Sequence, residues 1–595
     1  MKGFFKYVFA TMVGFIFSYI LIIIIMVAIV FGTISKVADD AFGKSDTDMV
    51  LKDGSILLID LKSQIVDRTE EMPFAEFGFF DDEQIAVELK DVTDKILKAK
   101  DDPKISGILL KLSFINASST SVDEIRLALL EFKASGKFVW NYSDYMTQKA
   151  FYLASMADKI ILAPEGELLF QGMSNEMIYL KGMFAKLDIE PTLIRAGDYK
   201  SAGEMLINDK MSDYERQQTE AFLLPVYNRM INIIAQSRNI DADKLHQIAD
   251  SLLVRKGEDA IKYKMVDDLM YIDQVYDALK EFTKKEKLNF VKLKNYNESE
   301  ESKKKKDKEY TRDKIAIIYA IGNIGFGKGD AKSIGSDGLV KTLRTARLDD
   351  NIKAIVLRIN SPGGAALPSD LSWREVKSAA EAKPLVVSMG ALAASGGYYI
   401  ACPADSILAE PNTITGSIGV FGVHMNLENF WNNKLGVRFE RIKTAEHADL
   451  MNPNRPITAE EQLIVQSYVN EVYSDFKNRV VEGRVLDPAL VDSIARGRIW
   501  SGIDAVENGL VDRIGNLYDA IDVAANMAGL ENYRIKELPK KSSPFENIPF
   551  LNMQMYRERA VKKTLGDDYK IYMKAQEIRN MNGGIYMQLP WEFDF

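Results

Sequence analysis

The first apolar stretch of the chain covers residues 7–35 and contains no charged side chain. As a helix rising about 1.5 Å per residue, such a stretch exceeds the roughly 30 Å hydrocarbon core of a bilayer. Lys2 and Lys6 precede it, and Asp39 and Asp40 follow it. Because positive flanks stay in the cytoplasm, the pattern predicts a single-pass anchor with the body of the protein outside. The predicted segments are a cytoplasmic terminus, the anchor and a juxtamembrane stretch (residues 1–6, 7–35 and 36–50).

A cleaved signal peptide is the alternative interpretation of the same stretch. Such a peptide has a shorter apolar region of about 7–15 residues and ends at a small-x-small cleavage site. Thr33-Ile-Ser35 resembles such a site only faintly, and no later stretch of the sequence is long and apolar enough to cross a membrane again. We therefore favour an uncleaved anchor.

Beyond residue 50, short apolar runs alternate with stretches of helical spacing. Residues 105–112 and 352–359 are mainly apolar and flanked by turn residues, which is typical of strands buried on both faces. Residues 122–133 and 369–382 follow them with helical spacing. A strand followed by a helix, repeated along the chain, predicts an α/β fold with mostly parallel sheets.

The chain also resembles itself. Three pairs of segments match, 106–112 with 353–359, 150–161 with 397–408 and 257–267 with 502–512. The spacing is 247 residues for the first two pairs (353 minus 106, 397 minus 150) and 245 for the third (502 minus 257). Separate matches at nearly one spacing indicate a tandem duplication, with predicted copies over residues 51–296 and 314–541.

The segments around the second copy carry little pattern. Residues 297–313 lie between the copies, and the mixed-charge run 297–309 has no apolar residue. It is typical of a solvated linker, although binding of its lysines to lipid is an alternative that the interleaved glutamates disfavour. Residues 542–595 contain several aromatic residues, and we expect a packing or assembly tail.

Composition narrows the classes of function. The 595-residue chain has 76 Lys plus Arg against 85 Asp plus Glu, a net charge of −9 that argues against a nucleic-acid partner. One cysteine and three histidines exclude a disulfide framework and a multi-cysteine metal site. We therefore expect no metal and no cofactor, and chemistry performed by Ser, Lys, Asp, Glu and the backbone.

Two glycine-rich motifs of the second copy could support such chemistry. Asn360-Ser-Pro-Gly-Gly364 follows a predicted strand and forms a tight turn whose N–H groups can face a crevice. In Gly390-Ala-Leu-Ala-Ala-Ser-Gly-Gly-Tyr-Tyr399, Ser395 lies among small residues directly before a helical stretch, in a favourable N-terminal field. Close helix packing alone is the alternative explanation for either motif.

A serine nucleophile needs a base. None of His246, His424 and His447 lies in an obvious catalytic motif, and His424, 29 residues beyond Ser395 (424 minus 395), is the second candidate. Lys200 lies among small residues in the first copy. A lysine can act as a base if burial lowers its pKa from about 10.4 toward roughly 7–8, whereas composition alone favours an exposed lysine.

Four motifs together resemble the signal peptide peptidase A family in its long, duplicated, membrane-anchored form, also called protease IV. They are Asn-Ser-Pro-Gly-Gly, Ala-Ala-Ser-Gly-Gly-Tyr-Tyr, Thr415-Gly-Ser-Ile-Gly419 and Tyr-Lys-Ser-Ala. The resemblance extends to about residue 530 and implies a fold like that of Clp protease and crotonase. It also implies a homotetramer or other homo-oligomer, and a serine endopeptidase that degrades cleaved signal peptides and other short or unfolded apolar peptides. Its place would be the bacterial inner membrane, with the catalytic body on the external side.

The resemblance further implies a role for each matching residue. Ser395 would be the nucleophile and Lys200 the general base of a Ser/Lys dyad. The N–H groups of Gly363 and Gly396 would form the oxyanion hole, with Gly364 as the alternate for Gly363. Ser417 could orient the lysine in a supporting role.

The repeat independently supports a divided site. At the spacing of 247 residues, Gln148 stands in the first copy where the second has Ser395, and residues 113–117 replace the Pro-Gly-Gly turn. At a spacing of 248 residues (448 minus 200), Ala448 stands opposite Lys200. Each copy retains what the other lacks, which predicts one dyad assembled from both.

Two other classes of function remain open. A non-proteolytic, membrane-associated assembly scaffold could keep the fold, but it need not keep Ser395 and Lys200. An acyl-thioester enzyme of the crotonase type would also use paired N–H groups, but coenzyme A thioesters are cytoplasmic and the predicted anchor places the body outside.

Overall fold

The structure is a computed structural model that describes residues 51–69, 85–305, 311–541 and 584–589, with a few isolated positions near both ends. The predicted segments 1–6, 7–35 and 36–50 lie outside the described residues, apart from Gly14 and Ser18. Within the part of the chain that is described, no helix combines the length and the apolar character needed to cross a membrane.

The first copy is built on a six-stranded sheet in which all neighbouring strands are parallel. Its order is β8-β6-β5-β4-β1-β9, with β1 Ser55–Ile59, β4 Ile105–Lys111, β5 Phe138–Met146, β6 Lys159–Leu168, β8 Asp268–Leu269 and β9 Phe290–Lys292. Helices α2 (Leu89–Asp101), α3 (Ser119–Ala134) and α4 (Gln148–Ala154) share one apolar core with it, and α10 (Ile272–Thr283) packs into a second cluster with Phe138 and Trp140.

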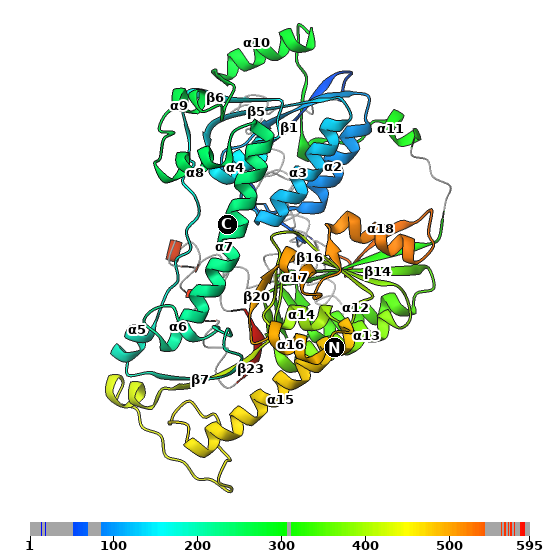
Figure 1. The fold of residues 1–595 in the computed structure, drawn as a ribbon. Helices are drawn as coiled ribbons and strands as arrows, with labels where there is room; N and C mark the ends of the chain where they lie inside the picture. Colours follow the sequence, from blue (N-terminus) through cyan, green and yellow to red (C-terminus); the bar gives the residue numbers. More distant parts are fainter. Residues whose placement is uncertain are drawn as a thin grey trace.

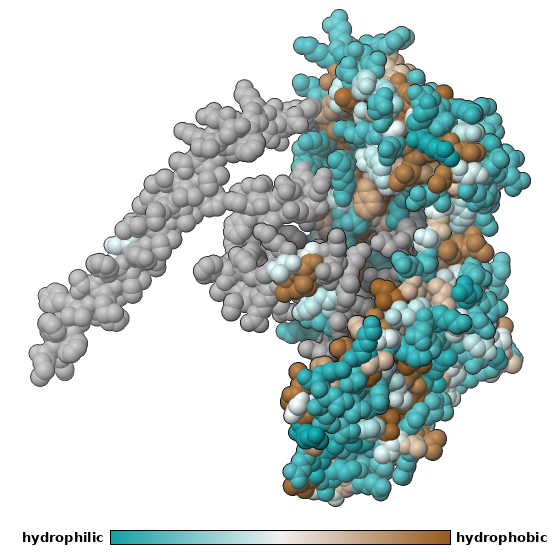
Figure 2. Space-filling view, turned by 90° about the vertical axis from the view of Figure 1, so that its left-hand side faces the viewer, coloured by the Kyte–Doolittle hydropathy of each residue, from teal (hydrophilic) through white to brown (hydrophobic). Residues whose placement is uncertain are grey.

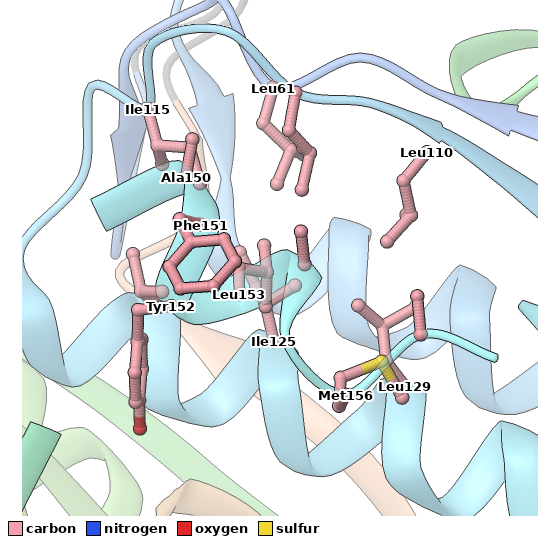
Figure 3. Packing of buried hydrophobic residues seen from close by; sticks show 14 of the residues in the cluster. Leu61, Leu110, Ile115, Ile125, Leu129, Ala150, Phe151, Tyr152, Leu153 and Met156 are labelled. Atoms are coloured by element: carbon pink, nitrogen blue, oxygen red, sulfur yellow. The ribbon is translucent and has the colours of Figure 1, made fainter. Parts of the chain in front are cut away.

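The core of the first copy forms where apolar positions of β4 and the helices meet. Leu110 of β4, Ile125 and Leu129 of α3, and Phe151 of α4 are fully buried and belong to one cluster (Figure 3). Each such side chain contributes about 1.5–3 kcal/mol when it leaves water. On the face in Figure 2, most of the described surface is hydrophilic and apolar residues occur in small groups, as expected when the sheets hold the apolar residues inside.

The second copy has an eight-stranded sheet that is parallel except where β20 pairs with β18. Its order is β20-β18-β16-β14-β10-β22, with β17 beside β16 and β21 beside β17. The strands are β10 Lys314–Ile321, β14 Ile352–Ser361, β16 Leu385–Ala394, β17 Ser406–Ala409, β18 Ile414–Gly416, β20 Ile499–Ser501, β21 Arg513–Ile514 and β22 Arg534–Leu538. The helices are α12 Ser336–Leu348, α13 Ala366–Ala380, α14 Gly396–Ala401 and α18 Leu517–Met527.

The elements confirm the predicted tandem duplication of an α/β unit. The predicted strands correspond to β4 and β14, and the predicted helices to α3 and α13. Helices α7 (Asp213–Arg238) and α15 (Ala459–Arg484) both have 26 residues and begin 246 residues apart (459 minus 213). Shorter helices follow them in the same order, α8 Ala242–Asp250 and α9 Gly257–Lys262 in the first copy, α16 Pro488–Ile494 and α17 Gly502–Glu507 in the second.

A third sheet joins the two copies. Its order is β12-β13-β11-β15-β23-β19-β7, with β7 Glu190–Ala196, β11 Asn323–Gly325, β12 Gly329–Asp330, β13 Ser333–Gly335, β15 Gly363–Ala365, β19 Val420–Asn426 and β23 Ile585–Gln588. Strand β7 belongs to the first copy but pairs antiparallel with β19 over its whole length. In Figure 1, β7 lies near α15 of the second copy, and α6 (Glu204–Ile207) and α7 follow it and lead back to the first copy.

A buried polar network also connects the copies. Arg358 of β14, 1% exposed, donates from Nε to Asp67 Oδ1 (2.8 Å) and from Nη2 to Glu124 Oε1 (2.5 Å). Asn360 Nδ2 donates to Asp67 Oδ2 (2.7 Å). Because buried charges are tolerated only when paired and hydrogen-bonded, these contacts fix the two copies against each other.

The predicted solvated linker, residues 297–313, is bound to the first copy near its start. Ser299 donates from its backbone N and from Oγ to the Asp102 carboxylate (2.9 and 2.8 Å), and Ser302 is 1% exposed at α11 (Glu300–Lys305). A run without apolar residues conceals this docking because hydrogen bonds to one carboxylate, not an apolar face, hold the segment.

Candidate active site

Ser395 lies at a strand-to-helix turn. Strand β16 ends directly before it and α14 begins directly after it, with Ser395 at φ 55° and ψ −117°. Residues other than glycine rarely adopt a positive φ, and such strain persists only where the surroundings enforce it. Here Ser395 N donates to Gly416 O (2.8 Å), and Tyr399 N of the helix donates to Ser395 O (2.8 Å). The turn therefore fixes the direction of the hydroxyl.

The small residues of this motif serve packing and chemistry together. A Cβ on Gly397 would lie 2.7 Å from Ser361 O, and a Cβ on Gly396 would lie 2.7 Å from Ser369 Oγ. Only glycine allows α14 to approach the Pro-Gly-Gly turn this closely. The glycines therefore do allow close packing, which was the alternative explanation for the motif. The same packing brings the Pro-Gly-Gly turn next to Ser395.

Lys200 reaches the second copy on a loop that follows β7. Tyr199 N donates to Arg496 O (2.8 Å), and Gln218 of α7 donates from Nε2 to Ser201 Oγ (2.9 Å). A Cβ on Gly497 would lie 2.5 Å from Lys200 N, so only glycine fits there. The loop is held from both sides, and the lysine side chain is fully buried.

The buried lysine and the buried serine meet within one chain. Lys200 Nζ lies 2.6 Å from Ser395 Oγ, 3.0 Å from Ser417 Oγ and 3.1 Å from Ser417 O. Burial lowers the pKa of Lys200 well below the usual lysine range, because desolvation disfavours the ammonium form. Burial therefore favours the neutral amine beside the hydroxyl.

The Pro-Gly-Gly turn presents a different N–H group from the one that the resemblance suggests. Gly363 N donates to Ser361 Oγ (3.1 Å), so this N–H is already engaged. Gly363 has φ 103°, which explains the glycine at this position. The alternate, Gly364, has its N only 3.2 Å from the place where a Cβ on Gly396 would lie. The structure therefore favours the N–H groups of Gly364 and Gly396 as the pair that could face an oxyanion.

The histidines have other partners. His424 of β19 is buried and its Nε2 contacts Asn452 O (3.0 Å), while burial lowers its pKa. The ring of His246 packs against Tyr227, and His447 lies 3.8 Å from Glu460. The hydroxyl of Ser395 is paired with Lys200 and with none of these rings.

The repeat positions that correspond to Ser395 and Lys200 carry neither a nucleophile nor a base. Gln148 begins α4, and its side-chain amide is bound to both backbone groups of Gly172 (Nε2 to O 3.2 Å, N to Oε1 2.9 Å). Ala448, opposite Lys200 in the repeat, is exposed. The structure thus brings together Lys200 of the first copy and Ser395 of the second.

Sequence reasoning missed one residue that shapes the site. Asp67 of the first copy accepts from Asn360, whose Oδ1 in turn accepts from Leu392 N (3.1 Å), three residues before Ser395. Asn360 was visible as the first residue of the turn motif. Nothing in the sequence around Asp67 indicates a contact 293 residues away.

Comparison with known proteins places both copies in one family model. The model described as peptidase family S49 matches residues 131–286 and 377–531. The chain is 36% identical to Protease 4 of Salmonella typhi over 496 residues, covering 80% of this chain and 79% of that protein. It is 35% identical to Protease 4 of Haemophilus influenzae, covering 73% and 72%. It is 32% identical to the chloroplastic serine protease SPPA of Arabidopsis thaliana, covering 84% and 73%.

A solved structure of a ClpP1 mutant from Listeria monocytogenes covers 34% of the chain at 15% identity and a TM-score of 0.24. This score is low, and the α/β architecture rests on the sheets described above.

Proposed function

The chain belongs to peptidase family S49 and is a serine protease, and from this premise we propose that Ser395 and Lys200 form its catalytic dyad. The observation that carries the proposal is the 2.6 Å contact between Lys200 Nζ and Ser395 Oγ, with both side chains fully buried. A lysine kept neutral by burial is the base that a histidine-poor chain can supply.

The contacts of Lys200 fit a neutral amine with two protons and one lone pair. The two N–H bonds can donate to Ser417 Oγ and Ser417 O, and the lone pair then faces the hydroxyl of Ser395. Ser417, whose φ is 50°, thus acts as a positioning residue, with its Oγ 3.0 Å and its O 3.1 Å from Lys200 Nζ.

The reaction proceeds in two stages on these groups. Lys200 takes the proton of Ser395 as Oγ attacks a peptide carbonyl, and the resulting ammonium gives that proton to the leaving amine. The N–H groups of Gly364 and Gly396 hold the oxyanion, each contributing about 10²–10³ in rate. Lys200 then deprotonates a water molecule, which hydrolyses the acyl-enzyme and releases Ser395.

The proposed substrates are cleaved signal peptides and other short or unfolded apolar peptides. Apolar side chains from α7, β16, β18 and β20 form a cluster that includes Ala394, the residue before Ser395. Its members are Phe222, Val226, Ala394, Ile414 and Ile499. Such surroundings favour apolar residues in a bound peptide. The apolar stretch 7–35 supports a location at the bacterial inner membrane with the catalytic body outside.

A homotetramer or other homo-oligomer is proposed as the working form. Several large apolar side chains of the segment between β19 and α15 are exposed in the single chain, Leu435 at 55%, Val437 at 42% and Ile442 at 99%. Such a group of exposed apolar residues is typical of a surface that another subunit covers.

Labelling with a serine-reactive fluorophosphonate tests the dyad. Wild-type protein should be labelled and should hydrolyse an apolar peptide, and Ser395→Ala and Lys200→Ala should do neither while their circular dichroism stays unchanged. Ser493→Ala, at an exposed serine of α16, is the matched control and should behave as wild type. Wild-type turnover by purified Ser395→Ala protein would overturn the proposal.

A further inference from the structure

A single glutamine of α7 is bonded to both residues that flank Lys200. Gln218 Nε2 donates to Tyr199 O (3.1 Å) and to Ser201 Oγ (2.9 Å). The side chain is buried, with 2% of its surface exposed. The nitrogen of a primary amide carries two N–H bonds, so these two acceptors use both of them. The glutamine therefore holds the lysine loop on either side of the residue that carries the amine.

The oxygen of the same amide contacts the second copy. Ile499 N of β20 donates to Gln218 Oε1 at a longer distance of 3.4 Å. Strand β20 pairs with β18, where Ile499 is opposite Gly416. Gly416 O accepts from Ser395 N, and Ser417 is the next residue. One side chain thus links the loop of the proposed base to the strands that hold the proposed nucleophile and Ser417.

These contacts fix the direction of the amide. Rotation of the amide by half a turn would place Oε1 against the carbonyl of Tyr199, where two acceptors would meet. The same rotation would place Nε2 against the N–H of Ile499, where two donors would meet. Because unsatisfied buried polar groups are costly, the observed direction is the stable one. Gln218 therefore connects the two copies in one defined arrangement.

Another clamp on the loop stays within the first copy. Arg195 of β7 donates from Nη1 to Lys200 O (3.1 Å) and to Glu204 Oε1 (2.5 Å). This clamp holds the main chain of the lysine against its own domain. Gln218 differs from it because its amide bonds to both copies.

We propose that Gln218 is a positioning residue that holds Lys200 Nζ at its distance from Ser395 Oγ. The amine contacts the hydroxyl of Ser395 and both oxygens of Ser417 at the same time, so a small displacement of the loop breaks this set. A displacement of about 1 Å can lower a rate roughly a hundredfold. Gln218 bonds to the neighbours of Lys200 and acts through them, and the proposal rests on the dyad proposed above.

Replacement of the amide by an apolar side chain of similar length tests this role. Gln218→Met should lower kcat about tenfold to a hundredfold and change KM less than about twofold, because a misplaced base affects the transition state and leaves substrate binding intact. Gln217→Met is the matched control. Gln217 is the exposed neighbour on the same helix, its Oε1 accepts from Tyr199 Oη (2.7 Å), and its variant should match wild type.

The pH profile separates positioning from a general loss of stability. Burial lowers the pKa of Lys200. A loosened loop admits water to the amine, so this pKa should return toward about 10.4 and the rise of kcat/KM should move to higher pH in Gln218→Met. A variant that is merely less stable would lose active molecules without moving the profile.

A double-mutant cycle tests whether Gln218 acts through the loop. Ser201→Ala removes one of the two acceptors of Nε2 and should lower kcat less than Gln218→Met does. In the Gln218→Met background, Ser201→Ala should cause little further loss, because the shared contact is already gone. Fully additive losses would contradict an action of Gln218 through Ser201.

Hydrogen exchange separates this proposal from the dyad. In Gln218→Met protein that also carries Ser395→Ala, the backbone amides of residues 199–201 and of Ile499 should exchange about tenfold faster than in Ser395→Ala alone. This readout needs no catalysis. Faster exchange together with wild-type turnover by Ser395→Ala would refute the dyad and retain the link between the copies.

Two results would overturn the positioning role. One is a folded Gln218→Met protein, judged by circular dichroism, that has the kcat and the pH profile of wild type while Ser395→Ala is inactive. The other is unchanged exchange of residues 199–201 and Ile499 in Gln218→Met, which would mean that the amide does not hold the loop.

Discussion

Lys200 Nζ lies 2.6 Å from Ser395 Oγ, although the two residues are 195 positions apart in the sequence and belong to different copies of the repeat. The pairing of β7 with β19 brings them together, because it carries the end of β7 to the edge of the second copy. Neither copy contains both groups, so the proposed dyad requires the contact between the copies.

Removal of the hydroxyl of Ser395 should abolish turnover and leave the fold intact. Ser395→Ala should lower kcat by about 10⁴-fold or more, because nucleophile and base act as one unit.

Ser417→Ala should lower kcat by about tenfold to a hundredfold with little change in KM, since it loses one of the two acceptors that orient the amine. Steady-state kinetics with a fluorogenic peptide measures both. Equal kcat in Ser417→Ala and wild type would remove Ser417 from the positioning role.

Activity should follow the titration of Lys200. Burial depresses the pKa of this lysine, and the neutral form is the base, so kcat/KM should rise as pH increases through that lowered pKa. Lys200→Arg should be inactive at every pH because a guanidinium stays charged. A pH profile of kcat/KM measures this, and an active Lys200→Arg protein would contradict it.

The same burial makes the stability of the protein depend on pH. Between the lowered pKa of folded Lys200 and the ordinary value near 10.4, the unfolded chain binds the extra proton, so stability rises with pH in this window. Lys200→Met, which has no proton to bind, should be more stable than wild type at neutral pH and should lose this part of the pH dependence. Denaturant unfolding at neutral and alkaline pH measures the difference. An unchanged pH dependence in Lys200→Met would contradict a depressed pKa.

Loss of Asp67 should weaken both the contact between copies and the turnover. Asp67→Ala leaves Arg358 without one of its buried partners and should cost about 3–5 kcal/mol of unfolding free energy. It also removes the anchor of Asn360, so kcat should fall even in molecules that remain folded. Asp60→Ala is the matched control, since Asp60 forms a surface pair with Lys62 and such pairs contribute about 0–1 kcal/mol. Stability and kcat equal to wild type in Asp67→Ala would refute the linkage.

Mixing inactive proteins should not restore activity. Ser395→Ala and Lys200→Ala proteins, combined under conditions in which subunit exchange is demonstrated, should stay inactive because the dyad forms within one chain. The second copy alone, residues 314–595, should also be inactive, since it lacks the lysine. Recovered activity in the mixture would place the dyad between chains.

Much of the site could be predicted from the sequence because its residues stand in distinctive local settings. Ser395 and Lys200 each lie among small residues, and the repeat shows that the other copy has lost the counterpart of each. The strands and helices followed from apolar periodicity. These signals are local, so they do not depend on contacts with distant parts of the sequence.

Other features depend on partners that lie far away in the sequence. The engagement of Gly363 N by Ser361 Oγ, which moves the candidate oxyanion donor to Gly364, is a matter of turn geometry that a Pro-Gly-Gly motif leaves open. Strand β23 has only four residues, too few to show a period, and its position follows from its pairing with β15 and β19. The docking of Ser299 on Asp102 likewise has no apolar signal.

The pairing of β7 with β19 also orders events during synthesis of the protein. A ribosome delivers the first copy before the second, and domains generally fold as they emerge. The growing chain therefore carries the Lys200 loop before Ser395 has been made, and the strand that pairs with β7 is made only with residues 420–426. With the proposed dyad, proteolytic activity would thus arise only after the second copy has been made and has packed against the first, so the unfinished chain would not yet cleave peptides.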